Sequence, residues 1–219
     1  MKNVQKTLLL TAGIFILLLV QSCQKEVSFS SNVLGVKIGT QLWTLKNLDV
    51  VTYRNGDVVP QVTDKDQWAN LTTGAWCYYN NDANNNSFHG KLYNWYAVND
   101  SRGLAPEGWH IPSKDEWTTL VTFLGGDVAA GGKMKATTLW TSPNTGATNE
   151  SGFTALPGGY RKDYGDFGFI GTNGYWWFSK EHDTGTAVER SLSFEYTDCN
   201  MYYYDKRNGM SVRCVKNSN

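Results

Sequence analysis

The residue with the clearest chemistry is Cys23, whose thiol can carry an acyl chain. Lysines at the start of the chain are followed by an apolar run over residues 8–20, and Ser22 stands directly before the cysteine. An aliphatic residue three positions before a cysteine, here Val20, with a small residue just before it, is the pattern of a bacterial lipoprotein signal. We therefore expect residues 1–22 to be a signal peptide that is cut before an acylated Cys23.

Two other interpretations of this segment fit less well. A membrane-spanning helix needs about 20 apolar residues, more than residues 8–20 supply. A plain secretory signal favours a small residue where Val20 stands, and it gives Cys23 no role. Two or more acyl chains anchor a protein stably. We expect residues 23–33 to be the lipid anchor and tether in the outer membrane of a Gram-negative bacterium, and the sequence leaves the face of that membrane open.

The other thiols are Cys77, Cys199 and Cys214, and their spacing matches no zinc motif. An exported chain can keep a disulfide, and three cysteines leave one unpaired. If Asn208-Gly209 is a two-residue turn, Cys199 lies about 13 Å along the strand from the position opposite Cys214, too far for a bridge. A four-residue loop over residues 205–208 would instead place these two cysteines opposite each other. The residues alone leave both arrangements open.

The rest of the sequence predicts neither catalysis nor a metal. The three histidines, His89, His110 and His182, offer no i, i+4 metal pair and no nucleophile at a recognised spacing. His110 precedes a predicted helix, and we expect it to be packed and hydrogen-bonded. Gly131-Gly132-Lys133 lacks the rest of a phosphate loop and predicts a turn. We therefore expect no catalytic residue, no metal site and no cofactor.

Aromatic side chains offer binding chemistry, because a flat apolar face flanked by polar groups can hold a sugar or a peptide. The chain has 9 Trp, 12 Tyr and 9 Phe. Trp140, Tyr164, Phe167 and Tyr202 lie among polar residues and glycines, so we predict that they form a ligand-binding surface. Other aromatic residues lie in or beside apolar runs and are expected in the core: Trp43, Trp95, Trp109, Trp117 and Trp177.

The charge balance argues against nucleic acid as a partner. Loss of residues 1–22 removes two of the 20 basic residues and none of the 20 acidic ones, so the net charge falls from 0 to about −2. No basic patch of the kind that nucleic acid needs is present in the sequence.

Short strands dominate the predicted structure. The pattern predicts a hairpin over residues 36–45, and Asn-Gly pairs at Asn55, Asn173 and Asn208 are typical of further hairpin turns. One domain over residues 34–219 is long enough to bury a core without metals or many disulfides.

Two helices are also predicted. The stronger covers residues 114–124, where apolar residues recur on one face. Ser113 stands at its N-cap and Glu116 three residues later, which is a capping box. The weaker helix covers about residues 90–98. Together these elements predict an α+β fold.

Several runs together resemble a known family. They lie at residues 36–43, 76–82, 90–98, 108–117, 152–161 and 211–215 and include Gly108-Trp109-His110-Ile111-Pro112. Their content and order resemble the Fibrobacter succinogenes major paralogous domain, over roughly residues 36–216. The resemblance implies a loop-rich C-type lectin-like domain, similar to formylglycine-generating enzymes, with two short helices and several short antiparallel strands and hairpins. It also implies a disulfide between Cys77 and Cys214, with Cys199 free.

The same resemblance implies an exported or lipid-anchored surface domain. We expect a non-catalytic surface lipoprotein whose partners are the membrane, through Cys23, and a glycan or an envelope protein. The alternative is a structural or adhesive envelope protein without a small-molecule site. A formylglycine-generating-type oxidase is disfavoured, because those enzymes use two cysteines a few residues apart near the C-terminus, whereas Cys199 and Cys214 are 15 apart.

Overall fold

A computed structural model describes residues 33–218 of the chain. The predicted signal peptide, the acylated Cys23 and all of the tether before Val33 lie outside the described residues. Within residues 33–218, no helix is both long enough and apolar enough to cross a membrane.

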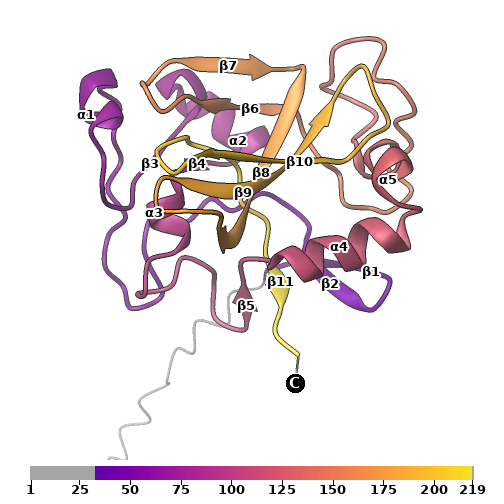
Figure 1. Cartoon of the computed structure of the whole chain (residues 1–219), viewed down its shortest axis with the longest axis horizontal. Coiled ribbons are helices and arrows are strands. Elements are labelled where there is room, and N and C mark those ends of the chain that lie inside the picture. Colours follow the sequence, from indigo (N-terminus) through magenta and orange to yellow (C-terminus); the bar gives the residue numbers. More distant parts are fainter. Residues whose placement is uncertain (1–32, 219) are drawn as a thin grey trace, which may run out of the picture. The chain divides into compact units, whose positions relative to one another are not determined.

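The described residues form a mixed α and β structure with three sheets and a few short helices (Figure 1). The strands are β1 Gly35–Ile38, β2 Gln41–Thr44, β3 Trp76–Cys77, β4 Leu92–Tyr93, β5 Trp109–His110, β6 Gly158–Arg161, β7 Phe167–Ile170, β8 Asn173–Glu181, β9 Thr186–Ser193, β10 Asn200–Asp205 and β11 Val215–Lys216. The helices are α1 Lys65–Ala69, α2 Asn86–His89, α3 Trp95–Val98, α4 Lys114–Phe123 and α5 Asp127–Met134, with 3-10 turns at Tyr79–Asn81 and Ala83–Asn85.

The two ends of the domain meet in a four-stranded sheet with the order β1-β2-β11-β5. The predicted hairpin over residues 36–45 is confirmed as β1 and β2, which turn at Gly39 with a φ of +59°. Val215 of the last strand lies between Trp43 of β2 and His110 of β5. This sheet therefore closes the domain by joining its first strands to its last.

A five-stranded sheet with the order β10-β9-β8-β6-β7 forms the centre. Its strands are antiparallel except for β6 and β8, which run parallel and meet at Gly159 and Gly174. The prediction of a hairpin turn at Asn173-Gly174 is wrong. Both residues lie in β8 opposite Ser193 and Leu192, because β7 pairs with β6 and not with β8.

The stronger predicted helix is confirmed as α4. The Ser113 hydroxyl accepts a hydrogen bond from the Glu116 backbone N–H at 3.3 Å, and the Glu116 carboxylate accepts one from the Ser113 N–H at 2.8 Å. The apolar face of α4 buries Trp117, Leu120 and Val121. The capping box therefore begins this helix where the sequence predicts it.

The weaker helix and the Gly131-Gly132 turn need correction. Residues 90–98 hold strand β4 and only one helical turn, α3, whose N-cap Asn94 accepts from the Ala97 N–H at 3.1 Å. Gly131 and Gly132 lie inside α5. A Cβ on Gly131 would collide with the Asp198 carbonyl, so glycine allows this helix to lie directly against the chain before β10.

The core lies on both faces of the central sheet. On one face, α4 and α5 pack with Trp43, Phe153, Trp176 and Phe178. On the other face, α3 and the segment around Met210 pack against Trp177. The five tryptophans predicted for the core are buried, as expected: Trp43, Trp95, Trp109, Trp117 and Trp177.

Three buried cations hold the irregular segments between these elements. The Arg213 guanidinium donates to the Thr44 and Thr154 carbonyls at 2.7 and 3.1 Å and to Asn47 Oδ1 at 2.7 Å. Lys135 Nζ donates to three carbonyls at 2.8–2.9 Å: those of Thr145 and Tyr196 in loops and that of Ser193 at the end of β9.

The third cation, Arg161, donates to four loop carbonyls at 2.7–3.1 Å: those of Val62, Thr63, Asp64 and Gly165. Burial lowers the pKa of Arg213 to about 9 and that of Lys135 to about 8. These side chains take the role that ladder hydrogen bonds have in longer strands, since buried carbonyls need donors.

Replacing Arg213 by Met is expected to lower the free energy of unfolding by about 3 kcal/mol or more, because three buried acceptors lose their donor. Urea unfolding followed by fluorescence measures the change. The matched control is Arg102→Met, which removes an exposed ion pair with Asp57 and Asp100 and should cost about 1 kcal/mol or less. Equal losses in the two variants would contradict the role assigned to Arg213.

Candidate functional site

The four residues predicted to bind a ligand differ in exposure. Trp140 is only 9% exposed, and its indole N–H donates to the Ala155 carbonyl at 2.9 Å. Lys135 Nζ lies 5.5 Å from the centre of its ring. Trp140 therefore belongs to the core, which corrects the expectation that it is exposed.

The other three residues lie in two parts of the central sheet, two in the β6–β7 hairpin and one on β10. Tyr164 is 47% exposed in the β6–β7 turn, with Lys162 Nζ 5.3 Å from its ring centre. Phe167 is half-buried against the Tyr79 ring. Tyr202 is 52% exposed on β10. Among the described residues, no ring contact joins any two of the predicted four.

A different set of rings gathers on the face of the central sheet that carries Trp177, and we call it the aromatic cluster. It consists of Tyr160 on β6, Phe169 on β7, Tyr175 on β8 and Tyr204 on β10. Tyr160 stacks on Phe169 with ring centres 5.7 Å apart and 11° between planes. It meets Tyr175 and Tyr204 edge-on at 4.8 and 5.9 Å. Four strands thus contribute to one group of rings.

Phe169 is the most exposed member of the cluster, at 50%. Its φ is +67°, a left-handed conformation that is uncommon for a bulky residue. Such backbone strain persists only where the surrounding structure enforces it, and it is concentrated at functional sites. In this position the half-exposed Phe169 ring stacks on Tyr160, which belongs to the buried core.

Tyr160 and Tyr175 are buried, at 8% and 6% exposed, and Tyr204 is half-buried. The hydroxyl groups of Tyr160, Tyr175 and Tyr204 make no hydrogen bond to any described residue. Burial raises the pKa of Tyr204 to about 12 and raises the pKa values of the other two tyrosines as well. All three hydroxyls therefore stay protonated at neutral pH and can both donate and accept.

A buried carboxyl group lies in the same sheet. Glu189 of β9 stands between Trp177 of β8 and Tyr202 of β10, and it is fully buried. Neither of its carboxyl oxygens has a hydrogen-bond partner among the described residues. Burial raises the pKa of Glu189 well above its usual value.

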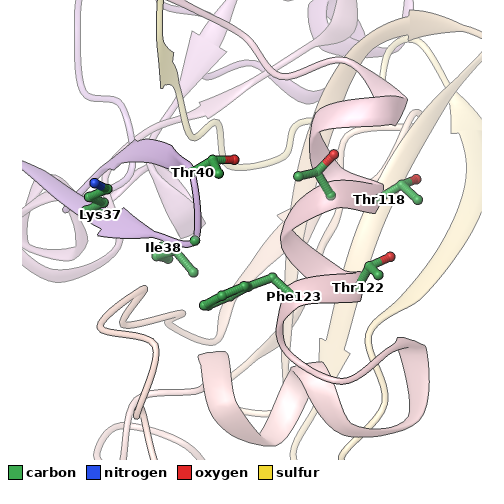
Figure 2. Close-up of a pocket in the computed structure, with 8 residues that line it drawn as sticks. Lys37, Ile38, Thr40, Thr118, Thr122 and Phe123 are labelled. Carbon is green, nitrogen blue, oxygen red and sulfur yellow. The ribbon is translucent and has the colours of Figure 1, made fainter.

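Two shallow grooves lie beside α4, away from the aromatic cluster. One is lined by the β1–β2 hairpin and α4, and Figure 2 shows Phe123 pointing from the helix toward Ile38. The other runs from Gln41 past Glu116 to Asn217. The first offers only one apolar ring with threonines and a lysine around it, which is no set of groups for acid–base chemistry.

His110 is hydrogen-bonded, as predicted. Its Nε2 lies 2.6 Å from Glu116 Oε1 and its Nδ1 lies 2.7 Å from Asn217 Oδ1. Both ring nitrogens are therefore engaged by side chains that position β5, the start of α4 and the end of β11. No nucleophile among the described residues contacts the ring.

The comparison with known families is consistent with this arrangement. The model of the Fibrobacter succinogenes major domain matches residues 36–216, which include both large sheets. The chain belongs to this family. No curated protein and no solved structure matches the chain.

The disulfide expected in this Fibrobacter succinogenes major domain is not formed. Cys77, Cys199 and Cys214 are free and fully buried. Each lies in a different hydrophobic cluster, so no two of them face each other. Burial raises the pKa of each thiol to about 12. Among residues 33–218 no three His, Cys, Asp or Glu side chains are grouped to hold a metal.

Part of the aromatic cluster could have been predicted from the alternation of residues along its strands. Tyr175 and Trp177, like Tyr202 and Tyr204, alternate along a strand and so share one face. The position of Tyr160 beside Tyr175 depends on the parallel pairing of β6 with β8, which no local pattern predicts.

The buried Glu189 makes stability depend on pH. Burial raises the pKa of Glu189 in the folded state, so the folded domain favours the protonated carboxyl group. The stability that this gives is fully present below the unfolded pKa of about 4.3. It decreases as the pH rises from that value to the folded-state pKa. Glu189→Gln should therefore be more stable than the unaltered domain at pH 7, and the difference should shrink toward pH 4. Each pH unit between the two pKa values is worth about 1.4 kcal/mol.

Thermal unfolding at pH 4 and pH 7 measures this difference. The exposed Glu195 supplies the control, since Glu195→Gln should change stability little at either pH. A Glu189→Gln variant that is less stable at pH 7 would show that the carboxylate is charged and needed there.

Proposed function

We propose that this chain is a non-catalytic, lipid-anchored envelope protein that binds glycan through the aromatic cluster. The observation that carries the proposal is Phe169, a half-exposed ring held in a strained conformation against Tyr160. A sugar ring has an apolar C–H face and a rim of hydroxyls. The cluster offers it an exposed ring face together with tyrosine hydroxyls that have no partner in the domain.

A binding role is supported further by the state of the reactive side chains. The three thiols are buried and protonated, which makes them poor nucleophiles and poor copper ligands. His110 is engaged at both ring nitrogens. These features argue against a formylglycine-generating-type oxidase.

We also propose a C-type lectin-like arrangement for the fold. Its support is the pairing of the N-terminal hairpin with the last strand, together with α4 and α5 packed on a central sheet of hairpins (Figure 1). In such an arrangement the long loops and strand ends at one side of the domain are available for recognition.

For the anchor, we propose acylation at Cys23 and attachment to the outer membrane. The support is the signal pattern around residues 8–22, and residues 24–33 would act as a spacer between the bilayer and the domain. A domain on a spacer can present its aromatic cluster to glycans of the envelope or of the surroundings.

A glycan array probed with the full chain in detergent tests the binding role. The full chain should bind a defined set of glycans, and Phe169→Ala should weaken that binding by about tenfold or more, equivalent to about 1.4 kcal/mol. Phe123→Ala is the matched control, because it removes an even more exposed ring, at 63%, from the groove beside α4. Tyr204→Phe separates the contribution of a hydroxyl from that of a ring.

Absence of binding to every glycan on the array would overturn the proposal and favour a structural or adhesive envelope protein. Equal loss of binding in Phe169→Ala and Phe123→Ala would also overturn the assignment to the aromatic cluster.

Metabolic labelling with an alkyne fatty acid tests the anchor. The chain should carry the label and remain in the membrane fraction, and Cys23→Ser should lose both properties. Cys199→Ala, which alters a buried thiol, should keep the label. A Cys23→Ser variant that is still labelled would place the acyl chain elsewhere.

A further inference from the structure

Strand β10 is the longest open edge among the described sheets. It has six residues and ends the five-stranded sheet, whereas the other edge strands, β1, β3, β4, β5 and β7, have four residues or fewer. Within residues 33–218, the backbone groups of residues 201–204 hydrogen-bond to no element other than β9. An edge of this kind is about 20 Å of unpaired donors and acceptors, the template for another strand.

The usual devices that protect an edge are missing from β10. It holds no proline and no lysine, and its one charged residue, Asp205, is the last. Tyr202 and Tyr203 at its centre are 52% and 49% exposed. The opposite edge, β7, is by contrast short and distorted by the positive φ of Phe169.

We infer that β10 pairs with β10 of a second copy of this chain, antiparallel and about a two-fold axis at Tyr203. The three consecutive tyrosines make the strand complementary to itself. With the axis at Tyr203, that residue faces Tyr203 of the second copy. Tyr202 then faces Tyr204 of the second copy, and Tyr204 faces its Tyr202. Tyrosine opposes tyrosine at three positions, the kind of aromatic cross-strand pair that stabilises antiparallel sheets.

The pairing fits the symmetry that soluble homodimers most often use, since a two-fold axis applies one patch to itself. It joins two five-stranded sheets into one continuous sheet. It also sets the two aromatic clusters on the same face, because a two-fold axis perpendicular to the sheet keeps each side chain on its own side.

Cysteine crosslinking of the full chain in membranes tests this pairing. Tyr203→Cys should form a disulfide-linked dimer under mild oxidation, because a residue on the axis meets itself. Tyr196→Cys is the matched control, since Tyr196 is equally exposed at 56% and lies outside β10, so it should not crosslink. Cys77, Cys199 and Cys214 are buried and do not compete, and the unaltered chain treated in the same way corrects for any crosslink through Cys23.

Register is tested with mixed copies. Chains carrying Tyr202→Cys, co-expressed with chains carrying Tyr204→Cys, should crosslink to each other. Hydrogen exchange of the unaltered chain gives a second readout: the outward amide protons of β10 should be protected, and Tyr203→Lys should remove that protection. No crosslink at Tyr203→Cys, equal crosslinking at Tyr196→Cys, or rapid exchange of the outward β10 amides would overturn the inference. Glycan binding does not enter these measurements, so this inference and the proposed function can fail separately.

Discussion

The structure depends on buried cationic side chains that satisfy the carbonyl groups of irregular segments. Strands β3, β4, β5 and β11 have only two residues each. Strand ladders therefore leave many backbone carbonyls of the connecting segments without a donor. The missing donors are the side-chain nitrogen atoms of three residues, each of which bonds several carbonyls: Arg213, Arg161 and Lys135. Their partners are carbonyls and an amide rather than carboxylates, so charge is buried without an ion pair and at a cost in desolvation.

One of these buried cations, Arg161, links the interior to the hairpin that carries Tyr160 and Phe169. Arg161 belongs to β6, next to Tyr160, and its guanidinium bonds carbonyls of residues 62–64 as well as that of Gly165. It also lies 4.4 Å from the Trp68 ring centre. The turn of the β6–β7 hairpin is thereby held against residues 62–64, whereas Phe169 lies toward the open end of the hairpin, opposite Gly159. An exposed turn is thus held in place by a side chain that is itself buried.

Features governed by near neighbours in sequence could be predicted, and features governed by distant ones could not. The start of α4 follows from Ser113 and Glu116, and the first hairpin follows from its apolar pattern. Helix α5 was missed because its glycines serve contacts with Asp198 and Gly146, far along the chain. Trp140 looked exposed by context, yet its N–H reaches Ala155 inside the core. For the candidate site, the abundance of aromatic residues predicts a binding surface. Which rings lie together follows only from the order of the strands in the sheet.

The separation of the three thiols into different clusters has a consequence for the life of the protein. Cys77, Cys199 and Cys214 are unreactive only while each stays within its own part of the core. In an oxidising solution, a chain that unfolds exposes all three, and any pair that oxidises ties together segments that the folded state holds apart. Refolding then waits for reduction. The half-life of the folded chain, set by how often it opens, therefore determines its survival more than its equilibrium stability does.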